Sequence, residues 1–271
     1  MLKEMIMKRS GWMYLESRKS ILLFSLFAFM ILSCNDEDGR ISLHYVENNL
    51  LELSYPSFDR YATSIIGGDG NYMVSCSDPA ILDVELIYGQ TVSFKSLSVG
   101  ETVVTIKDGS NNSYAVDVHI SYRTKKINIS NLDVSIEGET LTEDMISELR
   151  QKALATIPVT ENGGYWFVYT GEDGFTGEML VFPEGVGKES IEGSFVQEKR
   201  ESEQEYILAY KMNFGGRDRR FFIKQYNEDM LLRTSYVGPV AMYEDVTCLF
   251  HDEYPGLKAV HTLQLIKSGS D

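Results

Sequence analysis

The sequence predicts a mainly β protein with two folded domains, a β-sandwich over residues 41–122 and an α+β domain over residues 127–271. A polar, basic link, Arg123-Thr124-Lys125-Lys126, is expected to join them. Apolar and polar residues alternate along short runs of residues 41–122, as in strands that bury one face. Turn-forming residues interrupt the alternation at intervals typical of sandwich or barrel strands. One stretch, residues 141–157, instead has apolar residues at helical spacing. With 43% hydrophobic residues, the chain has enough apolar side chains for packed cores.

Short alternating runs make up the first domain. The clearest is Tyr114–Ile120, in which every second residue is apolar. Others are Ile41–Tyr45, Tyr72–Val74, Val92–Phe94 and Val104–Ile106. Gly, Asn and Asp, which tolerate the positive φ angles of tight hairpins, recur between the runs. The expected turns are Gly67–Gly70, Ser77–Pro79, Tyr88–Gln90, Val99–Glu101 and Asp108–Asn112.

These pieces follow the order of a bacterial Ig-like domain. The resemblance rests on Ile66–Val74 (IGGDGNYMV), Ser77–Ile81 (SDPAI), Val92–Phe94 (VSF) and Leu97–Ile106 (LSVGETVVTI). It implies an Ig-like β-sandwich that serves as a spacer or adhesion module without catalytic residues. Cys76 stands where this family commonly has a small polar residue, so the resemblance implies no disulfide there.

A helix is expected early in the second domain. Thr140-Leu141-Thr142-Glu143 fits a capping box, in which the Thr and Glu side chains bond the free N–H groups of a helix start. Apolar residues then recur at helical spacing until Pro158. They are Leu141, Met145, Ile146, Leu149, Ala153 and Ile157.

The rest of the second domain is expected to form a meander. Its strands are expected at Tyr165–Tyr169, Phe175–Phe182, Ser190–Val196, Tyr206–Met212, Phe221–Tyr226 and Met230–Tyr236. A second helix is expected at Tyr243–Glu253, before Tyr254-Pro255-Gly256, with a last strand at Leu257–Ile266. The sequence therefore predicts two helices and a large antiparallel sheet that could curl toward a barrel.

The first 33 residues have the layout of a secretory signal. Arg18 and Lys19 precede an apolar run that begins at Ile21, and the small residue Ser33 follows it. The run is shorter than the roughly 20 residues that span a bilayer as a helix. We therefore expect residues 1–33 to be cleaved as a signal peptide, with translation starting at Met1 or at an internal methionine.

Ile31-Leu32-Ser33-Cys34 resembles the lipobox of bacterial lipoproteins, apart from Leu32, where that family favours a smaller or β-branched residue. The resemblance implies cleavage before Cys34 and acylation of its thiol, so that outer-membrane lipid is a partner of the chain. Two or three acyl chains give stable anchoring, whereas one is marginal. The alternative is an uncleaved membrane anchor with an incidental cysteine.

An acidic tether, residues 34–40, follows the signal. Its Asp36-Glu37-Asp38 run resembles the export signal of Bacteroidetes-type surface lipoproteins, and Tyr243–Gly256 resembles endings of uncharacterised proteins of that group. The resemblance implies an outer-membrane lipoprotein displayed on the cell surface, and it names no function. A solvated tether on a periplasm-facing lipoprotein is the alternative.

Net charge limits the partners that the chain can have, and cysteine content limits its disulfide chemistry. The formal net charge is −15, and residues 1–33 carry five basic and two acidic residues, so their removal makes the chain more acidic. Phosphate backbones repel such a chain, and we expect no nucleic acid partner. Cys76 and Cys248 lie among apolar or small residues in different domains, which favours buried free thiols over a disulfide.

No motif identifies a catalytic, metal or cofactor site. The sequence has no GxSxG, GxxxxGK[ST] or HExxH pattern and no GxGxxG after a strand. Asp108–Asn112 resembles part of a calcium loop, but Ser113 and His119 stand where that loop requires Gly and Glu, so a hairpin is expected. Carboxylate pairs could serve a glycosidase, although sequence alone cannot rank them. We therefore expect no catalytic residue, metal or cofactor.

The histidines offer little more. His44, His119, His251 and His261 show no helical spacing for a shared metal. His119 alternates with Val118 and Ile120, so it is expected on the solvent face of its strand. His251 and His261 could approach one another in space.

Aromatic residues are the remaining candidates for binding. In Tyr165–Tyr169, Trp166 lies on one face and Tyr165, Phe167 and Tyr169 on the other. An exposed aromatic face could stack on sugars or bind a protein, and a core strand explains the same pattern. Three functions stay open: a non-enzymatic, lipid-anchored surface protein whose Ig-like spacer presents a C-terminal binding or adhesion domain, a glycan-processing accessory enzyme, and a structural subunit of a pilus or glycan-uptake assembly.

Overall fold

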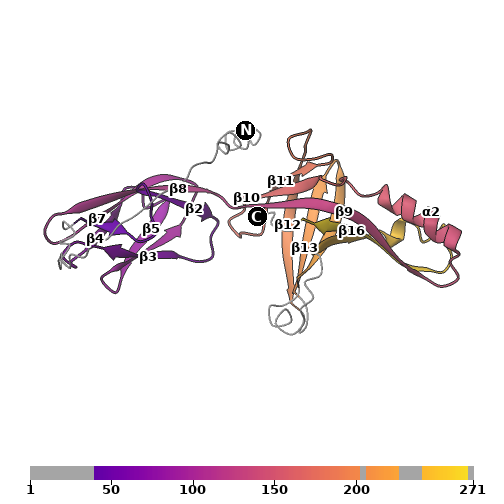
Figure 1. The fold of residues 1–271 in the computed structure, drawn as a ribbon, viewed down its shortest axis with the longest axis horizontal. Helices are drawn as coiled ribbons and strands as arrows, with labels where there is room; N and C mark the ends of the chain where they lie inside the picture. Colours follow the sequence, from indigo (N-terminus) through magenta and orange to yellow (C-terminus); the bar gives the residue numbers. More distant parts are fainter. Residues whose placement is uncertain (1–39, 202–205, 226–239, 268–271) are drawn as a thin grey trace, which may run out of the picture. The chain divides into compact units, whose positions relative to one another are not determined.

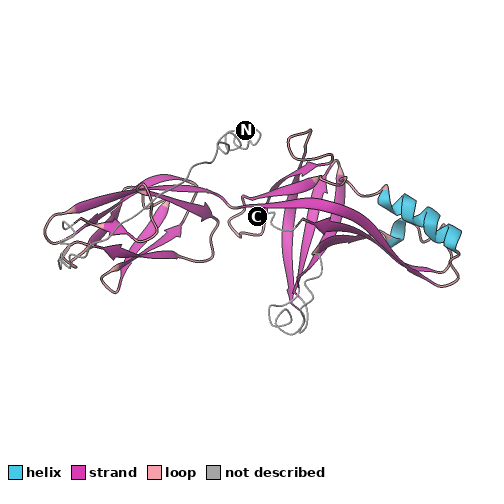
Figure 2. Ribbon diagram, viewed as in Figure 1, coloured by secondary structure: helices cyan, strands magenta, loops and turns pink. Residues whose placement is uncertain are grey.

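A computed structural model describes residues 40–201, 206–225 and 240–267 of this chain. The signal segment, Cys34, nearly all of the tether and the strand expected at Met230–Tyr236 lie outside the described residues. The described fold is mainly β, as the sequence predicts (Figure 1). It consists of two four-stranded sheets, a closed barrel of eight strands and, in this part of the chain, one α-helix (Figure 2).

Eight strands form the two four-stranded sheets. They are β1 (Ser42–Leu43), β2 (Leu50–Tyr55), β3 (Tyr61–Ile66), β4 (Met73–Cys76), β5 (Leu82–Ile87), β6 (Thr91–Ser96), β7 (Gly100–Lys107) and β8 (Ser113–Tyr122). The sheet orders are β1-β3-β6-β5 and β2-β8-β7-β4. Neighbouring strands are antiparallel except β2 and β8, which are parallel. Asp108–Asn112 joins β7 to β8 as the expected hairpin, closed by the Asp108 N–H bonding the Asn112 carbonyl.

The two sheets share one hydrophobic core. Val104, Val116 and Phe94 are at most 1% exposed and belong to a single cluster drawn from both sheets. The expected alternation is confirmed on β8, where Val116, Val118 and Ile120 are buried. Period-2 burial of this kind follows from the pleat, which turns successive side chains to opposite faces.

The second half of the chain forms the barrel. Its strands are β9 (Thr124–Gly138), β10 (Gly164–Tyr169), β11 (Thr176–Phe182), β12 (Ile191–Glu201), β13 (Tyr206–Phe214), β14 (Arg217–Gln225), β15 (Ala241–Asp245) and β16 (Leu257–Ile266). Each strand pairs antiparallel with its neighbours, and β16 pairs with β9 to close the ring. The large antiparallel sheet expected from the sequence thus curls completely, and its last strand has the predicted bounds.

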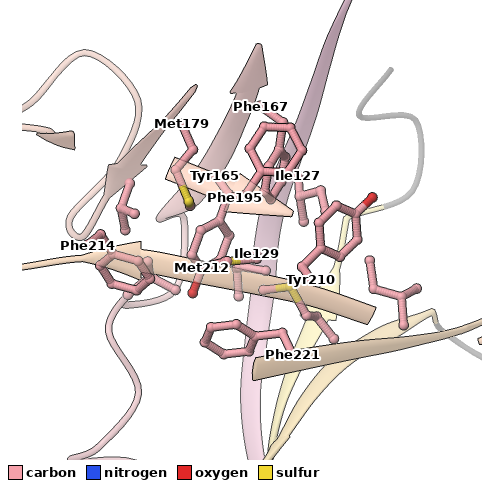
Figure 3. Packing of buried hydrophobic residues seen from close by; sticks show 14 of the residues in the cluster. Ile127, Ile129, Tyr165, Phe167, Met179, Phe195, Tyr210, Met212, Phe214 and Phe221 are labelled. Atoms are coloured by element: carbon pink, nitrogen blue, oxygen red, sulfur yellow. The ribbon is translucent and has the colours of Figure 1, made fainter. Parts of the chain in front are cut away.

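Aromatic and methionine side chains fill the barrel interior (Figure 3). Tyr165, Phe167, Met179, Tyr210 and Phe221 have no exposed surface. The Phe167 and Phe195 rings meet edge to face, with centroids 4.9 Å apart, a geometry that aromatic rings favour. The interior is therefore a packed core.

Beyond the barrel, β9 and β16 continue side by side as a two-stranded ribbon, against which the helix α2 (Glu143–Leu154) packs (Figure 1). Leu149 and Ala153 of α2 are fully buried there. The helix was expected, but its N-cap is Thr142 rather than Thr140, because the Thr142 hydroxyl accepts a bond from the Met145 N–H. Thr140 lies in a turn with φ of 65°.

The second helix expected at Tyr243–Glu253 is wrong. Residues 241–245 form strand β15, and only a short 3-10 helix, η1 (Thr247–Leu249), follows. Val246, Phe250 and Tyr254 are buried against the same cluster as α2. These three residues are four apart, as on one face of a helix, but they lie at the end of a strand and in the turn that follows it.

A single residue separates the last strand of the sheets from the first strand of the barrel. Tyr122 ends β8 and Thr124 begins β9, so the polar link expected between them is reduced to Arg123. Lys125 and Lys126, interpreted as part of that link, belong to the barrel wall, where Lys126 lies 4.2 Å from the Trp166 ring centroid. The division into independently folding domains stays a prediction.

Candidate functional site

The outer wall of the barrel is hollowed where β14, β15 and the η1 turn meet. The hollow is open to solvent and has a volume of about 690 Å³. It is lined by Arg220, Phe222, Asp245, Thr247, Cys248, His251 and Asp252. We refer to it as the β14–β15 hollow.

The strands diverge beneath this hollow. In the described residues, β14 and β15 pair only at Phe222–Tyr243 and Ile223–Met242, whereas β14 pairs with β13 along its whole length. Beyond those two pairs, side chains rather than backbone bonds join the strands. Arg219 and Glu244 form an ion pair there, with side chains 12% and 11% exposed.

An aromatic row crosses the outer wall beside the hollow. The rings of Phe222 and Tyr243 stack with centroids 5.3 Å apart and planes inclined by 23°. His261 of β16 meets the Tyr243 ring edge-on at 6.0 Å. All three side chains are half-buried, and Phe222 lines the hollow itself. The parts of these rings that stay exposed give the outer wall some apolar surface beside the hollow.

Arg220 lies over the Phe222 ring and shares the carboxylate of Glu198 with Lys211. Its guanidinium carbon is 5.1 Å from the ring centroid, and its Nη2 donates to Glu198 Oε2 at 2.9 Å. Lys211 holds the other oxygen of Glu198 at 2.5 Å. The hydrogen bond from Lys211 is the largest influence on Glu198, and with both neighbouring cations it lowers the pKa of that carboxyl.

Asp245 is the carboxylate set into the strand at the edge of the hollow. Burial acts to raise its pKa, but the bonds from the Thr247 hydroxyl and N–H, together with the charge of His261, outweigh burial and lower it. The Thr247 N–H donates to Asp245 Oδ1 at 2.9 Å, and the hydroxyl donates to the same oxygen. Asp245 is therefore held as an ionised hydrogen-bond acceptor.

The turn after β15 supplies the outer rim. Thr247 fixes it, because its hydroxyl oxygen also accepts a bond from the Val260 N–H at 2.8 Å. Cys248, His251 and Asp252 are exposed along this rim. The His251 Nδ1 lies 3.7 Å from Asp252 Oδ1, and both side chains are largely in solvent. Groups this exposed can accept or donate bonds to a ligand without prior rearrangement.

Behind the wall lies a buried polar layer. The Tyr165 hydroxyl donates to Gln264 Oε1 at 2.9 Å, and Gln264 and Thr262 have no exposed surface. The Thr262 hydroxyl and the Gln264 amide nitrogen make no hydrogen bond in the structure.

The expected aromatic face of β10 is divided between inside and outside. Tyr165, Phe167 and Tyr169 belong to the barrel core, which confirms their shared face and its interpretation as core. Trp166 is half-buried on the outer wall beside Phe182 and under Lys126. It lies outside the hollow.

The histidines and cysteines are only partly as expected. His119 does point away from the core, 3.2 Å from Glu101 Oε1. His261 stands opposite Asp245 on the neighbouring strand, and His251 lines the same hollow as Asp245. Cys76 and Cys248 are free, but neither is buried as expected. Cys76 is half-buried, and Cys248 is exposed, because its segment is a surface turn instead of a helix.

The sequence interpretation missed the residues that build the hollow. Arg220, Phe222 and Asp245 were not singled out, because no motif joins them. The alternation of β14, with Phe221 and Ile223 inside, places Arg220 and Phe222 outside and could have paired them as neighbours. Because residues 243–253 were predicted to be a helix, the outward-facing residues of β15 were not recognised from the sequence.

Within the described residues, no group of His, Cys, Asp and Glu is arranged to hold a metal ion. A helix apolar and long enough to cross a bilayer is likewise absent from that part of the chain. No protein-family model matches this chain, and a search of curated proteins finds none similar to it.

Proposed function

We propose that the chain is a non-enzymatic, lipid-anchored cell-surface protein whose barrel binds a ligand in the β14–β15 hollow. In this proposal the two N-terminal sheets are an Ig-like spacer that presents the barrel. The lipobox-like Ile31–Cys34 and the acidic run after it support the anchor. A packed interior supports placing the ligand outside the barrel rather than within it.

One observation carries the binding proposal. A half-buried aromatic ring, Phe222, stands in an open hollow that also holds a fixed ionised carboxylate, Asp245. Aromatic anchors with a few placed polar groups are typical of ligand sites. The hollow is open and its rim is largely in solvent, which suits binding better than chemistry that requires exclusion of water.

The binding proposal is tested on residues 35–271, which include every residue that the structure describes. Binding to a glycan array and to host matrix proteins is measured for the parent chain and for Phe222→Ala. We expect the variant to lose the ligand while its melting temperature stays near that of the parent. Tyr88→Ala is the matched control, because Tyr88 is 94% exposed and lies in the N-terminal sheets. Equal loss in both variants, or none in either, contradicts a site at the hollow.

The anchor is tested at Cys34. Cells that express the full chain are fed a clickable palmitate analogue, and Cys34→Ser is expected to remain uncut and unlabelled because the acylated thiol is gone. Labelling of that variant would exclude acylation at Cys34. Protease treatment of intact cells separates the two orientations, since a surface-displayed chain is digested and a periplasm-facing one is protected.

A glycan-processing enzyme is the second candidate, favoured by Asp245, His251 and Asp252 lining one hollow. Paired carboxylates of this kind serve glycoside hydrolysis when one of them stays protonated. Against this, the pKa of Asp245 is lowered. Release of reducing sugar from polysaccharides, abolished by Asp252→Asn, would establish the enzyme in place of the binding protein.

A further inference from the structure

We infer that the ligand of the β14–β15 hollow is a short peptide segment that carries both a basic and an acidic group. Asp245 and Asp252 bind its cation, and Arg220 binds its carboxylate. This inference rests on the proposed function and adds the chemical class of the ligand. It is carried by two unlike charges that stand on opposite sides of the hollow without pairing.

The hollow separates Arg220 from Asp245. Because Phe222 pairs with Tyr243, the same register continued by two residues sets Arg220 opposite Asp245, and both line the hollow. In a paired ladder, opposite side chains have Cβ atoms about 4.5–5.5 Å apart, and unlike charges there attract. In the described part of the chain, these two residues form no ion pair with each other, since Arg220 binds Glu198 and Asp245 accepts bonds from the turn after β15. The two charges therefore border an open space.

Arg220 keeps a positive charge on one side of the hollow. Glu198 accepts a bond from its Nη2 at 2.9 Å, but the other oxygen of Glu198 lies 2.5 Å from the Lys211 ammonium. Two cations thus share one carboxylate, which leaves an excess of one positive charge on the three side chains. The Arg220 side chain is 38% exposed, and a guanidinium has five N–H donors. Donors of this kind suit a carboxylate, which arginine binds through short, charge-assisted bonds.

The opposite side of the hollow is acidic. The bonds from Thr247 lower the pKa of Asp245, and both go to its Oδ1, which leaves Oδ2 without a hydrogen bond among the described residues. Asp252 is exposed on the rim. Two carboxylates on one wall attract an ammonium or guanidinium group. The net charge of the chain, −15, draws cations toward it from a distance.

A peptide fits this arrangement better than a flat ring does. Tyr243 stacks on Phe222 at 5.3 Å and Arg220 covers that ring at 5.1 Å, so a ligand meets its edge and gains affinity mainly from charge. Leu249, 61% exposed, follows Cys248 on the rim and offers an apolar contact. The volume of about 690 Å³ lies within the range of roughly 300–1,000 Å³ that is usual for small ligands. A few amino acid residues supply both charges and an apolar side chain.

The experiment measures the binding of short peptides with blocked ends to residues 35–271. Each peptide has a lysine and a glutamate separated by one to four glycines, in both orders. In matched peptides, glutamine replaces the glutamate, the lysine or both, and a further peptide has a free C-terminal carboxylate in place of the glutamate. Titration calorimetry at low and high NaCl concentration reports affinity. Protection of Cys248 from alkylation, read by mass spectrometry, reports whether the peptide occupies the hollow.

We expect a peptide with both charges to bind about tenfold or more tightly than either singly charged one, to protect Cys248, and to weaken at high salt, which screens ion pairs. Arg220→Gln should remove the advantage that the glutamate gives, without weakening the lysine-only peptide. Asp252→Asn should weaken only peptides that contain lysine. Lys95→Gln and Asp117→Asn are the matched controls, because both residues are exposed on the N-terminal sheets, and they should leave binding unchanged. These results together support the inference.

Other outcomes overturn it in distinguishable ways. A singly charged or uncharged peptide that binds as tightly as the doubly charged one, with Cys248 protected, refutes the pairing of charges and leaves the binding proposal standing. Peptide binding that neither protects Cys248 nor responds to Arg220→Gln and Asp252→Asn places the peptide elsewhere and refutes the inference. If no peptide binds, but an array ligand does and is lost in Phe222→Ala, only the ligand class is wrong. If nothing binds at the hollow, both the inference and the proposed function fail.

Discussion

Arg219 and Glu244 join two barrel strands where their backbones no longer pair. The Arg219 Nε lies 3.0 Å from Glu244 Oε1, its Nη2 binds the second oxygen, and the same Nη2 donates to the Thr156 carbonyl at 2.8 Å. One side chain therefore links β14, β15 and the segment that follows α2. A nearly buried pair of this kind is costly to break, because the remaining charge has no partner.

Glu244→Ala should reduce the free energy of unfolding by about 3–5 kcal/mol, the cost typical of leaving a buried charge unpaired. Urea denaturation followed by circular dichroism measures this loss. The double variant Arg219→Met with Glu244→Leu should recover most of it, because both charges are then absent. If Glu244→Ala unfolds with the same free energy as the double variant, the ion pair does not hold the strands together.

Thr262→Val should leave stability unchanged or raise it by up to about 1 kcal/mol, because the buried Thr262 hydroxyl makes no hydrogen bond. The reverse change two residues away, Val260→Thr, adds a hydroxyl at a fully buried position and should cost about 1–3 kcal/mol. Both positions lie on β16 and are fully buried, and Thr and Val are similar in volume. The difference in stability between the two variants therefore reports the effect of the hydroxyl. A clear loss in Thr262→Val would reveal a bond partner for it.

The chain should lose stability as the pH rises above 10. Burial raises the pKa of Tyr165 and of Tyr210 above the ordinary value of 10.0. A group whose pKa is raised by folding contributes stability below its unfolded pKa and loses it as the pH climbs past that value. Absorbance at 295 nm should show a late tyrosine step that coincides with loss of the far-UV signal. In Tyr210→Phe the decline of stability with pH should be shallower.

Thr142→Ala should cost about 1 kcal/mol of stability, the usual effect of losing an N-cap hydroxyl. The Thr142 hydroxyl bonds the Met145 N–H at 3.3 Å, whereas Thr140 precedes the helix in a left-handed turn. Thr140→Ala is therefore the control and should be milder. If thermal denaturation ranks the two variants in the opposite order, the helix begins at the capping box expected from the sequence.

Residues 41–122, expressed alone, should fold cooperatively with β-type circular dichroism. Their hydrophobic cluster is made only of residues from Ile41 to Ile120 and includes both sheets. The barrel cluster is made separately, from residues of β9 onward. An unfolded fragment beside a folded longer chain would mean that the sheets depend on the barrel.

The sequence was most informative where one face of an element is buried. Alternation located β8, because its inward residues Val116, Val118 and Ile120 recur with period 2. It failed at Lys125 and Lys126, whose charges suggested a link. Both ammonium groups instead lie near aromatic rings of the barrel, those of Tyr210 and Trp166, a contact that polarity alone does not reveal.

The candidate site was less accessible to prediction. Phe222 and Tyr243 are neighbours only because β14 and β15 pair in one register. That register depends on the closure of the whole ring, and nothing local specifies it. A period-2 pattern predicts which side chains of a strand point inward and which point outward. It does not predict which outward residues of neighbouring strands become neighbours, because that depends on the assembled barrel.

The pairing of β9 with β16 also sets the order in which the protein can be completed. The first strand of the barrel closes against the last, which ends at Ile266. Until the ribosome has released those final residues, β9 and β15 both present open strand edges, which are templates for aggregation. The N-terminal sheets have all their strands long before that moment. During synthesis, the barrel half is therefore the part that must be kept from premature association, and its closure is a slow, non-local step.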